Sequence, residues 1–190
     1  MTLTFERDPA MDDALADALV DLWVDVTNAG GAVGFLAPVA AAQIRPAVDA
    51  YAAALAEGRT RLLLGRDEHG RPAATAFLSL DSHPLTAHWA SLYTVMVHPK
   101  LQGGGHGRDL MAAAADLARD TPGIEAVRLS CRGGLGLERF YASCGYREVG
   151  RVPAAVRVAP GDDRDEVLML LPLRRSGSRE GLPETAERPG

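Results

Sequence analysis

The chain has 190 residues, of which 47% are hydrophobic and 24% are charged, and it carries a formal net charge of −5. These values predict one globular domain that can bury a core of its own. The negative charge argues against a nucleic-acid-binding protein, which would carry a basic surface, although it leaves room for a local basic pocket.

The cysteines and the N-terminus bear on the compartment. Cys131 and Cys144 are the only cysteines and form no C-x-x-C pair, which favours reduced thiols in a cytoplasmic protein. The first residues lack a basic segment followed by an apolar one, so we expect no signal peptide. The longest weakly polar run, 32–42, is interrupted by Pro38 and is too short to span a bilayer. We therefore expect no membrane association.

The first third of the chain carries two helical patterns. Apolar residues recur at helical spacing over 15–26, and Asp8-Pro9 is a suitable helix start. The second pattern covers 44–55 and should end at Gly58. Pro46 must kink this helix or begin its second half, because proline interrupts the helical hydrogen-bond ladder.

The middle of the chain changes to a strand pattern. Apolar runs at 61–65, 72–80 and 89–97 predict three strands, and the turn residues 67–70 separate the first two. We expect these strands to form an antiparallel meander.

The remaining elements predict an α+β domain. They are a helix over 108–119, a strand over 126–131, a helix over 137–144, and closing strands over 146–152 and 166–173 on either side of an acidic loop, 160–165. The full order, α-α-β-β-β-α-β-α-β-β, predicts a mixed sheet flanked by helices. Residues 174–190 are polar, so we expect a domain over 1–173 and a disordered tail over 174–190.

Four glycines lie in the segment Gln102-Gly103-Gly104-Gly105-His106-Gly107, between the strand that ends at Val97 and the helix that begins near Arg108. Glycines let the backbone approach a ligand closely. The first turn of a helix also presents free N–H groups and a positive dipole end to an anion. A phosphate or pyrophosphate is therefore the expected ligand, and a purely structural turn is the other interpretation.

The spacing of these glycines excludes two common phosphate loops. A dinucleotide-binding G-x-G-x-x-G motif that began at Gly103 would need glycine at Arg108, and one that began at Gly105 would need glycine at Leu110. A Walker P-loop would end in Gly-Lys-Ser/Thr, and that sequence does not occur here.

The pattern Q-x-x-G-x-G, formed by Gln102, Gly105 and Gly107, resembles that of the GCN5-related N-acetyltransferase (GNAT) family, whose loop holds the pyrophosphate of acetyl-coenzyme A. Residues 140–146 resemble the family's second motif, and the resemblance covers 61–173. It implies a GNAT-like, mostly antiparallel β-sheet flanked by helices. It also implies acetyl-CoA as the cosubstrate and no metal.

The resemblance implies how the cofactor is held. The strand before the loop would pair with the pantetheine arm and is usually splayed by a bulge, and a backbone N–H near Met96 or Val97 would polarise the thioester. Lys100 is a candidate for the adenosine 3′-phosphate. The residues expected to contact the cofactor are Val95, Met96, Val97, Gln102, Gly103, Gly104, Gly105, His106, Gly107 and Arg108.

Tyr141 matches the family tyrosine that protonates the sulfur of coenzyme A, although a buried core tyrosine is the alternative. The general base is open, because no glutamate lies on the strand before the loop. Asp81, His83, His88 and Tyr93 are the nearby candidates. The amine can also arrive neutral, since desolvation lowers its pKa. Gly134 stands where relatives often have a cofactor-binding asparagine, so that contact is in doubt.

The acceptor site is less defined. The family builds it from segments that correspond to 28–35 and 156–166, and we take Asn28, Asp81 and Tyr93 as candidate substrate-binding residues. The acidic cluster at 162–166 would attract a cationic amine or, alternatively, is a solvated loop. Segments 27–30 and 136–141 resemble the tabtoxin-resistance type of acetyltransferase.

The sequence thus predicts an acetyl-CoA-dependent N-acetyltransferase that acts by direct attack on a primary amine of a small, amino-acid-like or antibiotic-like molecule. It leaves a homodimer open. The alternatives are a non-catalytic acyl-CoA sensor and a protein N-terminal acetyltransferase.

Overall fold

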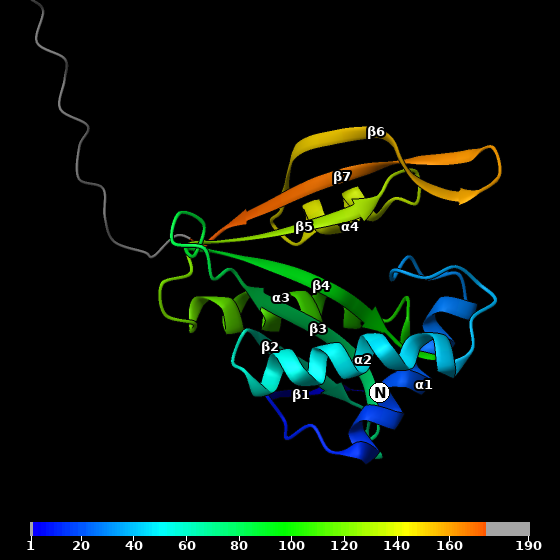
Figure 1. Ribbon diagram of the computed structural model, residues 1–190, viewed down its shortest axis with the longest axis vertical. Coiled ribbons are helices and arrows are strands. Elements are labelled where there is room, and N and C mark those ends of the chain that lie inside the picture. Colours follow the sequence, from blue (N-terminus) through cyan, green and yellow to red (C-terminus); the bar gives the residue numbers. More distant parts are fainter. Residues whose placement is uncertain (1, 174–190) are drawn as a thin grey trace, which may run out of the picture.

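The computed structural model describes residues 2–173, so the expected tail, 174–190, lies outside the described residues. Seven strands form one sheet in the order β1-β2-β3-β4-β5-β7-β6, and only β4 and β5 pair in parallel (Figure 1). The α+β fold class and the mostly antiparallel sheet are therefore confirmed. The elements are β1 (Thr4–Arg7), α1 (Asp13–Asn28), α2 (Ala41–Ala56), β2 (Thr60–Arg66), β3 (Pro72–Leu80), β4 (Trp89–Val97), the 3₁₀ turn η1 (Pro99–Leu101), α3 (His106–Arg119), β5 (Ala126–Arg132), α4 (Leu137–Ser143), β6 (Arg147–Ala159) and β7 (Asp162–Pro172).

The sheet opens between β4 and β5. These strands pair only where Trp89–Ser91 meets Ala126–Arg128, and beyond that point they diverge (Figure 1). The edge of β4 that faces β5 is consequently unpaired from Leu92 onward among the described residues. An unpaired strand edge can accept an extended ligand as an added strand.

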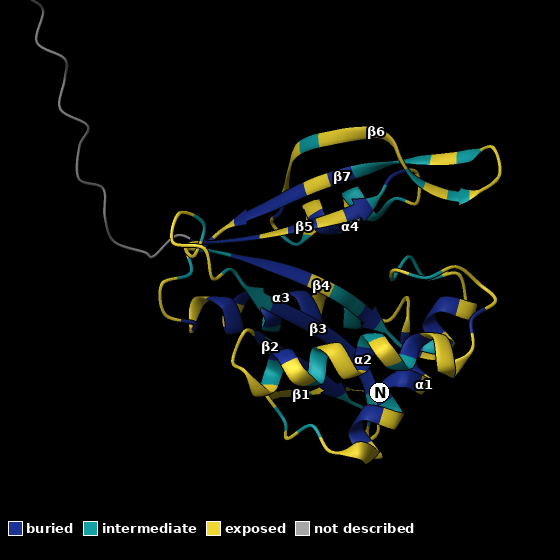
Figure 2. Ribbon diagram, in the orientation of Figure 1, coloured by how far each residue is buried: buried dark blue, intermediate teal, exposed yellow. Residues whose placement is uncertain are grey.

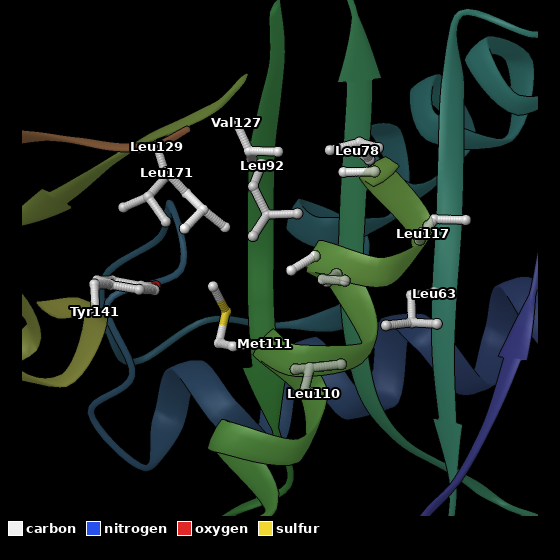
Figure 3. Close-up of a cluster of buried hydrophobic side chains, with 14 of the residues drawn as sticks. Leu63, Leu78, Leu92, Leu110, Met111, Leu117, Val127, Leu129, Tyr141 and Leu171 are labelled. Atoms are coloured by element: carbon white, nitrogen blue, oxygen red, sulfur yellow. The ribbon is translucent and has the colours of Figure 1, made fainter. Parts of the chain in front are cut away.

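Two hydrophobic clusters hold the sheet from opposite faces. Leu62 and Leu64 of β2 pack with α1 and α2, whereas Leu63 packs with α3, because successive strand residues point to opposite faces. The central strands are consequently buried, whereas β6 is mostly exposed (Figure 2). Figure 3 shows the cluster on the α3 side, which includes Tyr141.

The N-terminal segment differs from its prediction. The predicted order lacked β1, which pairs with β2 at the sheet edge. Helix α1 begins at Asp13 instead of near Asp8, because the Asp12 side chain accepts a hydrogen bond from the Leu15 N–H at 2.8 Å and caps the helix. Asp8 instead accepts the Leu62 N–H at 2.9 Å and joins the strands.

The rest of the predicted order is confirmed, with one difference in α2 and one in the β6–β7 hairpin. Strands β2, β3 and β4 form the expected antiparallel meander. Helix α2 begins before Pro46 and continues through it as one helix, so Pro46 does not begin a second half.

The predicted acidic loop, 160–165, is mostly strand. β6 and β7 form one long hairpin in which Asp163 pairs with Arg157 and Asp165 pairs with Arg151, at 2.7 and 3.1 Å. Asp162 pairs with Arg164. The three aspartates are thus already matched by arginines, which removes much of the attraction for a cationic amine that the sequence suggested. Glu166, the remaining acidic residue of 162–166, forms no ion pair with a described residue.

Candidate active site

The glycine loop leads into the N-terminus of α3 and leaves its donors free. The N–H groups of Arg108 and Asp109 donate to the Gly105 carbonyl, whereas those of residues 103–107 have no acceptor within residues 2–173. Neighbouring free N–H groups at the positive end of a helix are suited to binding an anion.

Local geometry explains why this loop is glycine-rich. Gly103 and Gly105 have φ values of 80° and 90°, which other residues rarely adopt. A Cβ at Gly107 would lie 3.2 Å from the ring of Phe140, so glycine lets α3 pack closely on α4. The Gln102 amide donates to the Val97 carbonyl at 2.9 Å and ties the loop to the end of β4.

Strand β4 has a bulge near Thr94, close to its C-terminal end. The register between β3 and β4 shifts there, and Thr94 adopts a φ of 50°. Two hydrogen bonds hold this conformation: the buried Thr75 hydroxyl donates to the Thr94 carbonyl, and the Thr94 and Tyr51 hydroxyls are hydrogen-bonded, both at 3.0 Å. The structure thus has a bulge at the position where the family resemblance implies one.

The first of two pockets, which we call the loop pocket, has a volume of about 690 Å³ and lies between the glycine loop, the end of β4 and α4. It brings together most of the predicted cofactor-binding residues: Val95, Met96, Val97, Gln102, Gly103, Gly105, Gly107 and Arg108. Gly104 and His106 do not line it, and Lys100 lines a separate hollow with His98. Arg108 is exposed and forms no ion pair with a described residue, so it is available to an anion.

The second pocket, which we call the aromatic pocket, has a volume of about 570 Å³. Its α1–α2 side carries Trp23, Phe35 and Tyr51, and its β5–β7 side carries Arg132 and Glu166. The sequence had indicated Glu166 only as part of the acidic cluster at 162–166, and it had not indicated Arg132. The signal available was their position at the ends of two apolar strand runs, but only the pairing of β5 with β7 brings them to one place.

Tyr141 lies where the two pockets meet. Four residues line both of them: Ala32, Val33, Val95 and Tyr141. Burial raises the pKa of Tyr141 well above its ordinary value, and its neighbours Cys131 and Cys144 add to the rise. The phenol therefore keeps its proton at neutral pH and can donate it.

Several predicted acceptor or base residues lie away from this junction. The Asn28 side chain bonds both the N–H and the carbonyl of Val39, and it lines neither pocket. The other base candidates lie near the start of β4: Asp81, His83 and His88. Leu80, next to Asp81, pairs there with Ala90, which is roughly 20 Å along the strand from Met96. Tyr93 lines the aromatic pocket and is about half exposed.

Asp81 and Gly134 have other local partners. Hydrogen bonds from Thr86 and from the His83 N–H lower the pKa of Asp81, and Arg128 contributes, so Asp81 is a poor proton acceptor at neutral pH. The Gly134 N–H donates to Glu138 at 3.3 Å.

In the part of the chain that the structure describes, no group of three or more His, Cys, Asp or Glu side chains is arranged to hold a metal ion. No helix within residues 2–173 is long and apolar enough to cross a bilayer.

Comparison with known proteins identifies the family. The model of the acetyltransferase (GNAT) family matches residues 16–146. Several solved structures share the fold. A protein provisionally identified as a phosphinothricin N-acetyltransferase is 17% identical and has a TM-score of 0.73, and the match covers 92% of this chain and 100% of that chain. The provisionally identified acetyltransferase YncA from Salmonella typhimurium, solved with acetyl-CoA, is 19% identical with a TM-score of 0.71 (96% of this chain and 100% of that chain). The ribosomal-protein-S18-alanine N-acetyltransferase from Escherichia coli is 19% identical with a TM-score of 0.66 (95% and 100%). At these identities the solved structures establish the fold, whereas the family model covers more than half of the sequence. The chain therefore belongs to the acetyltransferase (GNAT) family and is an N-acetyltransferase.

Proposed function

We propose that the protein transfers the acetyl group of acetyl-CoA to a primary amine of a small molecule, by direct attack within a ternary complex. The observation that supports this most directly is the position of Tyr141, which lines both the loop pocket and the aromatic pocket. A group that protonates the departing sulfur has to stand between the donor and the acceptor.

The loop pocket is proposed as the acetyl-CoA site. The free N–H groups of residues 103–107 would bind the pyrophosphate, and Arg108 would add a charge-assisted contact. The unpaired edge of β4 beyond the Thr94 bulge would pair with the pantetheine arm. A backbone N–H near Met96 or Val97 would then stabilise the negative charge that develops on the thioester oxygen.

The chemistry needs a proton removed and a proton supplied. The neutral amine attacks the thioester carbon, a C–N bond forms, and the C–S bond breaks as the tetrahedral intermediate collapses. Tyr141 gives a proton to the thiolate, and the amine loses one to solvent or to a nearby base. A tyrosine is protonated at neutral pH, and burial raises the pKa of Tyr141 further above that range.

The aromatic pocket is proposed as the acceptor site. A pocket of about 570 Å³ has the size of sites that bind small molecules. The fold shared with the protein provisionally identified as a phosphinothricin N-acetyltransferase is compatible with an amino-acid-like acceptor. We further propose that residues 1–173 form the catalytic domain.

Replacing Tyr141 tests this proposal. We expect Tyr141→Phe to lower kcat by roughly ten- to a thousand-fold without weakening acetyl-CoA binding measured by calorimetry. Tyr146→Phe is the matched control, because Tyr146 is equally buried and packs against Tyr141 but lines neither pocket. Full activity of Tyr141→Phe would show that the assigned acid is wrong. Acetyl-CoA binding without turnover of any amine would favour the sensor alternative.

A further inference from the structure

Two opposite charges lie side by side on the sheet wall of the aromatic pocket. Arg132 ends β5, and Glu166 is its register partner on β7. Directly paired residues of antiparallel strands point to the same face, with Cβ atoms about 5 Å apart. Both side chains line the aromatic pocket.

Neither charge has a partner within residues 2–173. The Nε atom of Arg132 is buried without a hydrogen bond, and no ion pair within 4.0 Å involves Arg132 or Glu166. The neighbouring arginines behave differently, because Arg157 pairs with Asp163 and Arg164 pairs with Asp162. The field of Arg132 helps to lower the pKa of Asp162. A buried N–H without a partner is costly and is usually satisfied by a ligand or by water.

We infer that the acceptor carries an oxyanion beside its amine, as an amino acid does, and that Arg132 binds the oxyanion while Glu166 faces the amine. The inference rests on the proposed acetyltransferase function. A guanidinium binds a carboxylate in a planar, two-point geometry. Glu166 is the one carboxylate among the residues that line this pocket, which fits an acceptor with a single amine better than a polyamine.

The opposite, aromatic wall of the pocket would contact the rest of the acceptor. Trp23 packs edge-on against Phe35 at 5.5 Å, and Tyr51 stacks on Phe77 at 4.0 Å, so these rings form a rigid apolar surface. A hydrocarbon side chain would lie against this surface while the charged groups face the sheet.

The test compares acids with their neutral counterparts. Thiol release from acetyl-CoA is measured with a panel of L-amino acids, each paired with its carboxamide. The wild-type enzyme should prefer the acid. Arg132→Met should lower kcat/KM for the acid ten- to a hundred-fold, mainly through KM, and change that for the carboxamide less than about twofold. Arg132→Lys should retain part of the preference.

Two further variants sharpen the test. Arg128→Met is the matched control, because Arg128 lies on the same face of β5 but bonds Ser91 and does not line the aromatic pocket. Glu166→Gln should lower kcat/KM for the acid and the carboxamide alike, since both carry the amine. An unchanged Glu166→Gln enzyme would contradict the inference.

Failure of this inference is distinct from failure of the proposed function. If the wild-type enzyme acetylates acids and carboxamides equally, or if Arg132→Met affects both equally, the oxyanion site is wrong while acetyl transfer stands. If no amine releases thiol, the proposed function itself is wrong, and the inference falls with it.

Discussion

At the scale of single residues, the bulge at Thr94 sets the backbone of the β4 residues that line the loop pocket. The left-handed conformation of a threonine is costly and persists only where neighbours hold it. Thr75 and Tyr51 supply the two hydrogen bonds. Val95, Met96 and Val97 follow immediately and line the loop pocket, so a shift in the bulge would move the backbone that is proposed to polarise the thioester.

Thr75→Val removes one of these bonds while keeping the shape of the side chain. We expect unfolding free energy in urea to fall by about 1 to 3 kcal/mol, because the buried carbonyl loses its donor, and kcat/KM for acetyl-CoA to fall several-fold. Thr60→Val is the control, since Thr60 is also buried on a strand but its hydroxyl bonds no described residue. Equal activity of the two variants would show that the bulge does not depend on Thr75.

Sequence-based prediction at this scale depended on motifs. Tyr141 and most of the loop residues belong to local patterns, so the sequence indicated them. Arg132 belongs to no pattern, and Glu166 was indicated only as part of the acidic cluster at 162–166. The two become neighbours only through the pairing of β5 with β7. Asp81 precedes the strand that leads to the glycine loop. Because each strand residue adds about 3.3 Å, the length of β4 separates Asp81 from that loop.

At the scale of elements, α3 and α4 meet at Gly107 and Phe140, beside the glycine loop and Tyr141. Gly107 lies in the first turn of α3, and Phe140 precedes Tyr141 in α4. We expect this close approach to couple the position of the glycine loop to that of Tyr141.

A double-mutant cycle tests this coupling. Gly107→Ala should raise the Kd for acetyl-CoA about tenfold, because the added Cβ would lie 3.2 Å from the Phe140 ring, which has to move by a few tenths of an ångström. Phe140→Leu in the same chain should recover part of the affinity, giving a coupling energy above about 0.5 kcal/mol by calorimetry. Gly150→Ala is the control, since its Cβ would meet Leu168 at an ordinary 3.4 Å. Additive effects of the two substitutions would exclude the coupling.

Elements whose apolar residues recur with a clear period could be predicted from the sequence. Elements that depend on strand pairing or on ion pairs could not. The meander and the helix after the glycine loop follow from alternating or helical apolar patterns. β1 has only four residues and one large apolar side chain, Phe5, so its sequence carries little strand signal. The tip of the β6–β7 hairpin carries arginine and aspartate side chains that pair with one another. From sequence alone, a segment with so many charges is predicted as a loop.

At the scale of the whole molecule, one buried thiol and two buried phenols affect how folding stability depends on alkaline pH. Burial raises the pKa of the Cys131 thiol to about 11, and it also raises the pKa values of Tyr141 and Tyr146. The unfolded chain loses these protons at lower pH than the folded chain does. The corresponding stability is therefore complete below about pH 9 and is lost as the pH rises above that value.

Urea unfolding measured from about pH 7 to about pH 11 tests this dependence. We expect the free energy of unfolding to decline above about pH 9, by up to about 1.4 kcal/mol per pH unit for each of the three groups. Tyr146→Phe should decline less steeply than the wild type. A free energy that stayed constant across this range would mean that these groups titrate alike in both states.

The central claim, that the glycine loop and Tyr141 serve one acetyl transfer, is tested most directly by product analysis. The full-length protein is incubated with acetyl-CoA and a panel of small primary amines, and free thiol and acetylated amine are quantified together. We predict equimolar thiol and acetylamine for at least one amine, with both reduced in parallel in Tyr141→Phe. Acetyl-CoA binding without acetylation of any amine in the panel would contradict the claim.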